Sequence, residues 1–152
     1  MAAQGPHQLA ADAPLGKDAR MKLLRDVAVR HLVTVEPGNS LHRAAHSMTD
    51  RDVGAAVVIE REQVVGIITE RDVLRAVAAG TDVDATTVAD FMTRGVVSGA
   101  PGWDLIKAVK TMADRGFRHL LVMEMDEPVG IVSLRDLMNA MVEMIQPEDA
   151  SA

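Results

Sequence analysis

The heptapeptide GIITERD, residues 66–72, decides the fold because it returns sixty-four residues later as GIVSLRD, residues 130–136. This offset aligns residues 34–77 with residues 98–141 without a gap, and about fifteen of the forty-four pairs are identical. A repeat of this length usually means two copies of one supersecondary unit, each of which needs its neighbour to complete a core. The sequence therefore predicts two similar halves.

Each copy predicts the element order β-α-β-β-α. In the first copy, residues 32–35 predict a strand, and helical spacing of apolar residues from position 41 to position 48 predicts a helix that Ser40 can cap. Two apolar runs then predict an antiparallel hairpin, and a second helix follows that Gly80 ends. The equivalent elements of the second copy fall at residues 95–98, 104–115, 119–124, 129–133 and 134–145.

The strands are almost continuously apolar, which predicts that both faces of each sheet are covered. Each half has only two helices for this purpose, so we expect the halves to pack sheet to sheet about a pseudo-twofold axis, with clefts where they meet. Residues 86–92 predict a short helical bridge, and residues 23–29 hold the same place before the first copy. The predicted fold class is α+β, with a flexible arm (1–19), two domains (20–80 and 81–145) and an acidic tail (146–152).

Composition narrows the class of protein. The 152 residues are 48% hydrophobic and 25% charged, which is typical of a globular protein. A net charge of -6 and 2% aromatic residues argue against nucleic acid binding through phosphate neutralisation or base stacking. The chain has no cysteine and no apolar run long enough to span a membrane. We expect a cytoplasmic protein that binds neither nucleic acid nor membranes.

The repeated heptapeptide places a hydroxyl residue at the end of a strand and an aspartate in the first turn of the following helix. Free backbone N–H groups at such a helix start favour an anion, a carboxylate can accept hydrogen bonds from both hydroxyls of a ribose, and a guanidinium suits a phosphate. Helix capping alone explains a single copy of this pattern. Retention of hydroxyl, arginine and aspartate in both copies favours a further requirement, although shared ancestry also preserves residues.

On these features the chain resembles a tandem pair of CBS (cystathionine β-synthase) domains over residues 20–145. The resemblance is carried by the two heptapeptides, by the duplicated β-α-β-β-α order, by VADFMTRGVVS at residues 88–98 and by RHLLVM at residues 118–123. It implies a regulatory module that binds adenosine nucleotides (AMP, ADP or ATP) or S-adenosylmethionine in two clefts between the halves. It also implies a homodimer that signals to a regulated protein, with no further cofactor.

The resemblance assigns residues to each cleft. In the first, which we name the Asp136 cleft, the expected residues are Ser133, Arg135, Asp136, Arg118, His119, His31, Val53, Gly54 and Ala55. In the second, the Asp72 cleft, they are Thr69, Arg71, Asp72, Gly95, Phe117 and His119. Because the second half has Arg118 and His119 where the first half has Gly54 and Ala55, we expect the Asp136 cleft to bind a nucleotide more tightly.

Other residue patterns give weaker indications of function. His42 and His46 have the spacing of metal ligands, but they lack an acidic or cysteine partner nearby, so we expect a solvated helix flank and no metal site. His119 is equally well explained as a buried histidine. Ten methionines fit core or dimer packing.

No sequence motif of nucleophilic, nucleotide-hydrolysing or dinucleotide-dependent catalysis is present, so we expect no enzyme activity. Two hypotheses remain: a sensor of an adenosine ligand, and a dimerising scaffold that binds no ligand.

Overall fold

The computed structural model describes residues 21–146, so the predicted arm and nearly all of the predicted tail lie outside the described residues. The predicted element order is confirmed in both halves. The first half contains β1 (Thr34–Val35), α2 (Leu41–Asp50), β2 (Ala55–Glu60), β3 (Gln63–Thr69) and α3 (Glu70–Ala78). The second contains β4 (Ser98–Gly99), α5 (Leu105–Arg115), β5 (His119–Glu124), β6 (Glu127–Ser133) and α6 (Leu134–Ile145). Short helices α1 (Leu24–Val27) and α4 (Val88–Phe91) precede the two halves.

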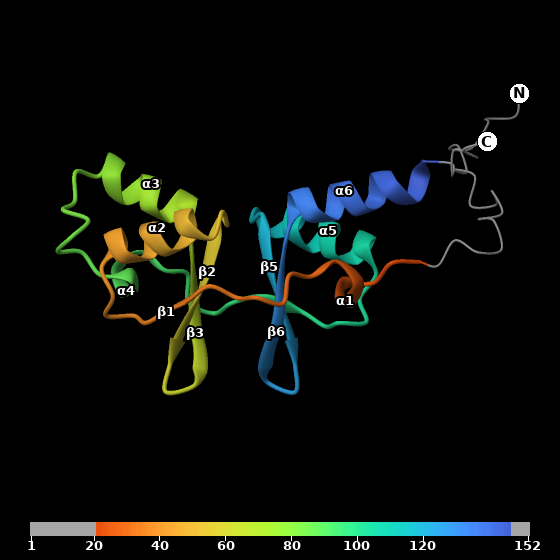
Figure 1. Ribbon diagram of the computed structural model, residues 1–152, viewed down its shortest axis with the longest axis horizontal. Helices are drawn as coiled ribbons and strands as arrows, with labels where there is room; N and C mark the ends of the chain where they lie inside the picture. The colour runs from red at the N-terminus through yellow and green to blue at the C-terminus, as the bar shows by residue number, and fades with distance from the viewer. Residues whose placement is uncertain (1–20, 147–152) are drawn as a thin grey trace, which may run out of the picture.

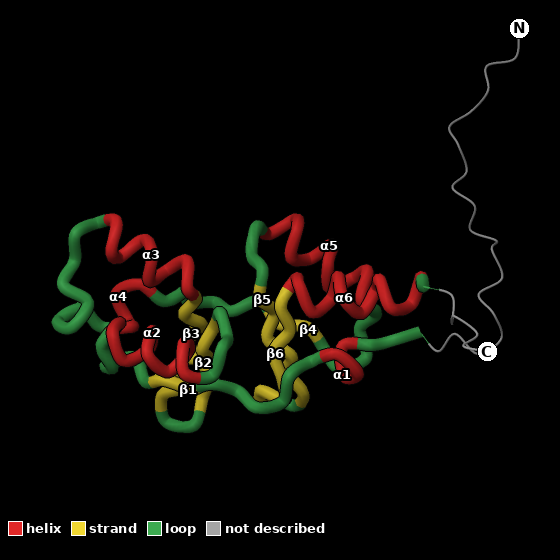
Figure 2. The backbone as a smooth tube through the Cα atoms, turned by 45° about the horizontal axis from the view of Figure 1, so that its top comes forward, coloured by secondary structure: helices red, strands yellow, loops and turns green. Residues whose placement is uncertain are grey.

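Each half has one three-stranded sheet of mixed direction. β1 runs parallel to β2, and β2 runs antiparallel to β3; β4, β5 and β6 repeat this arrangement. The strands of the two sheets lie side by side in the middle of the molecule, and the helices lie on the outer sides (Figures 1 and 2). No helix within residues 21–146 combines the length and the apolar character needed to cross a membrane.

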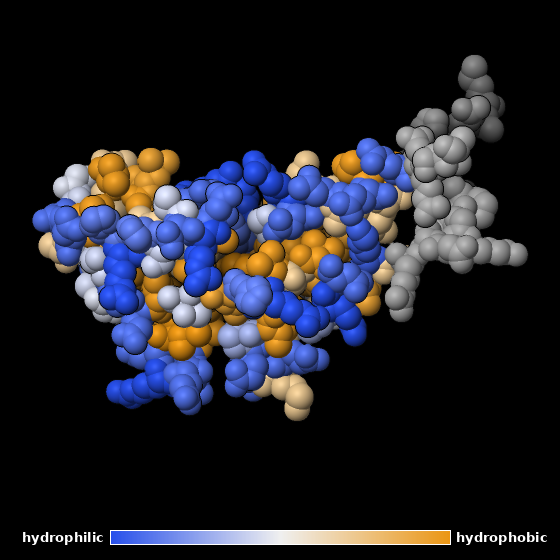
Figure 3. Space-filling view, viewed as in Figure 1, coloured by the Kyte–Doolittle hydropathy of each residue, from blue (hydrophilic) through white to orange (hydrophobic). Residues whose placement is uncertain are grey.

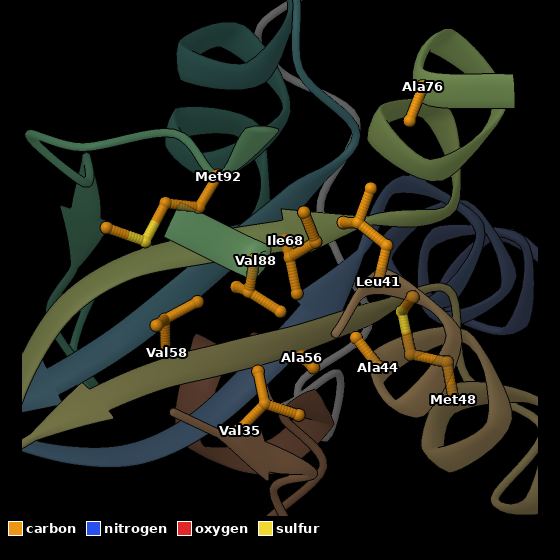
Figure 4. Packing of buried hydrophobic residues seen from close by; sticks show 10 residues of the cluster. All are labelled: Val35, Leu41, Ala44, Met48, Ala56, Val58, Ile68, Ala76, Val88 and Met92. Carbon is orange, nitrogen blue, oxygen red and sulfur yellow. The ribbon is translucent and has the colours of Figure 1, made fainter. Parts of the chain in front are cut away.

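Both faces of each sheet are covered, as predicted. In the first half, alternate residues of β2 and β3, such as Ala56, Val58 and Ile68, pack against α2 and α3 to form one core (Figure 4). Val57 is 1% exposed yet lies outside this core, and Leu121 of β5 is its counterpart in the second half. Because successive side chains of a strand point to opposite faces, these residues face the other sheet. The two sheets therefore meet along an apolar contact, which we name the seam.

The short helices α1 and α4 do not pack on the half that follows each of them in the chain. Each packs on the other half. Leu24 of α1 is fully buried in the core of the second half, whereas Val88 of α4 is fully buried in the core of the first. Their connecting segments also extend the opposite sheets: Val29 pairs with Ile131, and Thr93 pairs with Ile67. The chain therefore crosses the seam twice in similar ways (Figure 1). The predicted domain limits at residues 80 and 81 stay a prediction.

The hairpin turns are tighter than the sequence predicts. Residues 61–62 and 125–126 form two-residue connections, and all four have positive φ angles between 49° and 64°. Turns of this type match the twist of the strands and normally use Gly, Asn or Asp. Of the four residues only Asp126 is of such a type, and neither turn contains a glycine, which is why no clear turn signal is present in the sequence.

Candidate functional site

The repeated heptapeptides form two strand-to-helix junctions with the same capping geometry. Asp72 Oδ2 accepts hydrogen bonds from Thr69 N at 2.8 Å and Thr69 Oγ1 at 2.9 Å, and Asp72 N donates to Thr69 Oγ1 at 3.4 Å. In the second half, Asp136 Oδ2 accepts from Ser133 N at 2.9 Å, and Asp136 N donates to Ser133 Oγ at 3.1 Å. Capping thus occupies one oxygen of each carboxylate. The other oxygen, Oδ1, has no hydrogen bond within the described residues.

Asp72 differs from Asp136 in its surroundings. Asp72 is 6% exposed and is the only buried charged or polar residue between residues 21 and 146, whereas Asp136 is half-buried. Arg75 Nη1 lies 3.8 Å from Asp72 Oδ1. A buried carboxylate needs partners for its remaining lone pairs, and a ligand hydroxyl can supply one. Asp72 is therefore the stronger candidate for ligand contact.

A cavity of about 270 Å³ opens beside Asp72 at the seam. This is close to the lower end of the range for ligand pockets, about 300–1,000 Å³. All six residues expected in the Asp72 cleft line it: Thr69, Arg71, Asp72, Gly95, Phe117 and His119. One wall comes from β3 and α3 of the first half, and the other comes from the end of α5 and the start of β5 of the second. The cavity therefore belongs to neither half alone.

Arg118 lies in a different cleft from the one expected. The sequence places it with Asp136, which is in the same half, but in the structure it lines the cavity of Asp72. The reason is that the first heptapeptide faces the start of β5, in the opposite half, across the seam. Two further arginines of this cavity, Arg75 and Arg115, were missed. A signal existed for Arg75, because it lies one helical turn after Arg71 on α3.

The remaining expected residues do not line a described cavity. Seven residues expected in the Asp136 cleft line neither this cavity nor a smaller one next to it: Ser133, Arg135, Asp136, His31, Val53, Gly54 and Ala55. A Cβ built on Gly54 would lie 3.1 Å from both Glu70 Oε1 and His119 Nε2, so these two side chains occupy the space above that glycine. Val53 packs against the first core. The pseudo-symmetry of the backbone is therefore broken by side chains at the seam.

His119 lies at the seam, beside Gly54 and at the edge of the cavity. Burial holds the pKa of His119 below its usual value of 6.5; the carboxylate of Glu70 opposes this effect, Arg118 lowers the pKa further, and Asp136 raises it. The imidazole is thus surrounded by charged groups from both halves.

A second, smaller cavity of about 200 Å³ lies next to the first. Gly95 and Val96 line both cavities, and the second is otherwise bounded by Val64, Val65, Ser98, Leu121 and Met123. Its lining is mostly apolar, and it contains no charged residue. The first cavity thus has a charged end beside the arginines and an apolar side towards the middle of the seam.

His42, one of the paired histidines of α2, contacts an aspartate. His42 Nδ1 lies 2.6 Å from Asp84 Oδ1, and both side chains are exposed. Within residues 21–146, no group of three or more His, Cys, Asp or Glu side chains is arranged to hold a metal ion.

Comparison with known proteins gives one consistent family. The CBS domain family matches residues 24–79 and again residues 88–143. The CBS domain-containing protein YhcV of Bacillus subtilis is 36% identical over 118 residues, which is 77% of this chain and 84% of that protein.

Two solved structures of CBS domain proteins are similar to this chain. The CBS-domain containing protein ATU1752 from Agrobacterium tumefaciens is 32% identical, with a TM-score of 0.75 over 80% of this chain and 94% of that one. The CBS domain protein PAE2072 from Pyrobaculum aerophilum, complexed with AMP, is 25% identical, with a TM-score of 0.72 over 80% of this chain and 97% of that one.

The lowered pKa of His119 predicts a pH-dependent stability. In the window below 6.5 and above the folded-state pKa, the unfolded chain binds more protons than the folded chain, so the free energy of unfolding falls as the pH falls. We expect the difference in unfolding free energy between the wild type and His119→Gln to be constant above pH 7.5, roughly one unit above the usual histidine pKa. It should decline towards acid, as measured by urea unfolding across the pH range. Contributions of the other histidines cancel in this difference, and a difference that does not change with pH would contradict the prediction.

Proposed function

The chain belongs to the CBS domain family, and from this membership we propose that it is a regulatory module that binds an adenosine-containing ligand in the Asp72 cleft. The observation that carries the proposal is the buried carboxylate of Asp72, which keeps one oxygen free of the helix cap beside a cavity with walls from both halves. The related PAE2072 structure with AMP supports an adenosine ligand.

The proposed binding mode assigns a role to each side of the cavity. Asp72 Oδ1 accepts hydrogen bonds from the ribose hydroxyls, which is the charge-assisted contact a carboxylate makes best. The adenine lies towards Gly95, Val96 and Phe117, where the lining is apolar. The phosphates lie towards the arginines, including Arg118. Adenosine nucleotides and S-adenosylmethionine share the ribose contact and the adenine contact.

We expect the Asp72 cleft to be the tighter of the two, which reverses the expectation from the sequence alone. That expectation rested on Arg118 and His119 supporting Asp136. Since Arg118 lines the cavity of Asp72, its charge favours a phosphate there. Asp136 is only half-buried and lines neither this cavity nor the smaller one next to it.

Ligand binding in this position gives a route for regulation. A ligand that contacts α3 of one half and β5 of the other is sensitive to their relative placement, and so it favours one arrangement of the halves. A protein partner that reads this arrangement must change the affinity for the ligand by the same factor. We propose that such a partner exists, without naming the protein.

A dimerising scaffold is the alternative function, and one observation favours it. Leu74 of α3 is 67% exposed and Met138 of α6 is 57% exposed, and the repeat makes these two positions equivalent. Val77, Val142 and Ile145 extend the same helices with exposed apolar side chains. Apolar surface is visible over the regions of α3 and α6 at the upper left and upper right of the molecule (Figure 3). Two related apolar faces on one chain suit a twofold partner, so we infer that a second copy of the chain covers them.

The role of Asp72 is tested with three matched aspartates. We expect Asp72→Ala to weaken binding of its preferred adenosine ligand by about ten- to a hundredfold, the effect of about 1.5–3 kcal/mol for one lost charge-assisted contact. Asp136→Ala should cost less than about threefold, which is below 1 kcal/mol. Isothermal titration with AMP, ADP, ATP and S-adenosylmethionine measures these changes.

Asp90→Ala is the control for helix capping. Asp90 Oδ2 accepts hydrogen bonds from Thr87 N at 3.1 Å and Thr87 Oγ1 at 3.0 Å, as Asp72 Oδ2 does from Thr69, but Asp90 lies at neither cavity. Its variant should lose stability without losing affinity. Equal losses in the Asp72 and Asp136 variants would refute the asymmetry, and binding of none of the four ligands by the wild type would favour the scaffold.

The second copy is tested by charge insertion on the apolar face. We expect the wild type to sediment as a dimer and the double variant Leu74→Glu, Met138→Glu to sediment as a monomer, because a buried unpaired carboxylate strongly opposes association. Met125→Glu is the control, since Met125 is 93% exposed in a hairpin turn away from these helices. A monomeric wild type, or a dimer that survives the double substitution, would contradict this interface.

A further inference from the structure

Positive charge is concentrated at the Asp72 cleft, in a protein that is acidic overall. The chain has a net charge of -6, with 22 acidic residues against 16 lysines and arginines. Four of those 16 cationic residues line this single cavity: Arg71, Arg75, Arg115 and Arg118. Only two carboxylates, Glu70 and Asp72, line it with them. Four positive charges against two negative ones leave the cavity lining with a net charge of +2, without counting His119.

These guanidinium groups are mostly not engaged with acidic partners. Among residues 21–146, Arg75 is the only one of the four with a carboxylate oxygen within 4 Å, namely Asp72 Oδ1 at 3.8 Å. Three arginines without such pairs on one cavity indicate an anionic ligand with several acceptor groups.

The four arginines are divided between the two walls. Arg71 and Arg75 lie one helical turn apart on α3 of the first half. Arg115 ends α5, Gly116 turns the chain with a φ of 74°, and Arg118 follows just before β5 of the second half. Two guanidiniums therefore face the cavity from each side of the seam. One phosphate can satisfy one wall, but a longer phosphate chain can reach both.

The internal repeat provides a built-in comparison. The positions equivalent to Arg71 and Arg115 in the Asp136 cleft are Arg135 and Arg51, but those equivalent to Arg75 and Arg118 are Asn139 and Gly54. Carboxylates at the equivalent positions are Asp136 and Asp52, the latter in place of Gly116. Two positive and two negative charges cancel in that cleft. The excess of positive charge is thus specific to the Asp72 cleft and does not follow from the shared fold.

We propose that the Asp72 cleft selects adenosine ligands that carry two or more phosphates, in preference to AMP, adenosine and S-adenosylmethionine. The inference rests on the proposed function and names the class of ligand within it. A diphosphate or triphosphate offers charge and acceptor oxygens to both walls at once. S-adenosylmethionine instead brings a sulfonium cation towards four guanidinium groups, which repel it.

The same arrangement links the ligand to the placement of the two halves. Without an anion between them, the paired arginines of opposite walls repel each other across the seam. A phosphate chain removes this repulsion and bonds to both walls, so it favours a closed seam. Ligands that contact one wall only cannot have this effect, because a ligand shifts an equilibrium only through its different affinity for the two states.

Isothermal titration of the whole chain in magnesium-free buffer tests the proposal with ATP, ADP, AMP, adenosine, S-adenosylmethionine and tripolyphosphate. We expect ADP and ATP to bind at least about tenfold more tightly than AMP, which is the effect of one added charge-assisted contact, and S-adenosylmethionine to bind most weakly. Higher ionic strength should weaken ADP binding much more than adenosine binding.

The variants separate this charge preference from ligand binding itself. The double variant Arg115→Ala, Arg118→Ala should bring the affinities for ADP and AMP to within about threefold of each other, a difference of less than 1 kcal/mol. Arg51→Ala, the same change at the position equivalent to Arg115, should leave the preference intact. Thermal unfolding of each variant checks that it is folded, and all of these arginines are exposed.

The possible failures are distinguishable. AMP or S-adenosylmethionine binding as tightly as ADP, or a preference for ADP that survives loss of Arg115 and Arg118, would overturn the polyphosphate inference and leave an adenosine-binding module. Tripolyphosphate binding as tightly as ATP would contradict recognition of adenosine while keeping the preference for phosphate chains. Binding of none of these compounds would overturn both proposals.

Discussion

Each half of this protein depends on a segment that leads into the other copy. Leu24 completes the second core and Val88 completes the first, and each segment continues by pairing with the outer strand of the sheet it joins. Since a core that lacks one of its buried side chains loses both transfer free energy and packing, neither half is complete without the crossing chain. The position of one sheet against the other is thereby set by backbone hydrogen bonds and buried side chains, not by surface contacts.

That constraint turns a common capping motif into a site. The carboxylate of Asp72 uses one oxygen to hold the start of α3 and keeps the other at the seam, where the fixed placement of the halves brings the end of α5 opposite it. Asp90 accepts the same two hydrogen bonds from the threonine before its helix but lines neither cavity. One aspartate side chain can thus both cap a helix and contact a ligand. Whether it can contact a ligand depends on whether it lies beside a cavity.

The sequence predicted the fold well because repetition and apolar periodicity are local signals. It also grouped the six residues of the Asp72 cleft, which line one cavity, because the resemblance supplied both sides of the seam; their role in ligand binding stays a prediction. It misplaced Arg118, since the proximity of Arg118 to Asp136 along the chain does not indicate which motif it faces across the seam. It also did not indicate that α1 packs on the second core, or that Glu70 and His119 lie over Gly54, because these contacts depend on side-chain packing between distant segments.

A crystal structure of the chain grown with ADP would locate each part of the ligand against each half. We expect the ribose hydroxyls within hydrogen-bond distance of Asp72 Oδ1 and the two phosphates between the arginines of α3 and those preceding β5. A nucleotide bound at Asp136 with the Asp72 cleft empty, or one that contacts a single half only, would contradict the account.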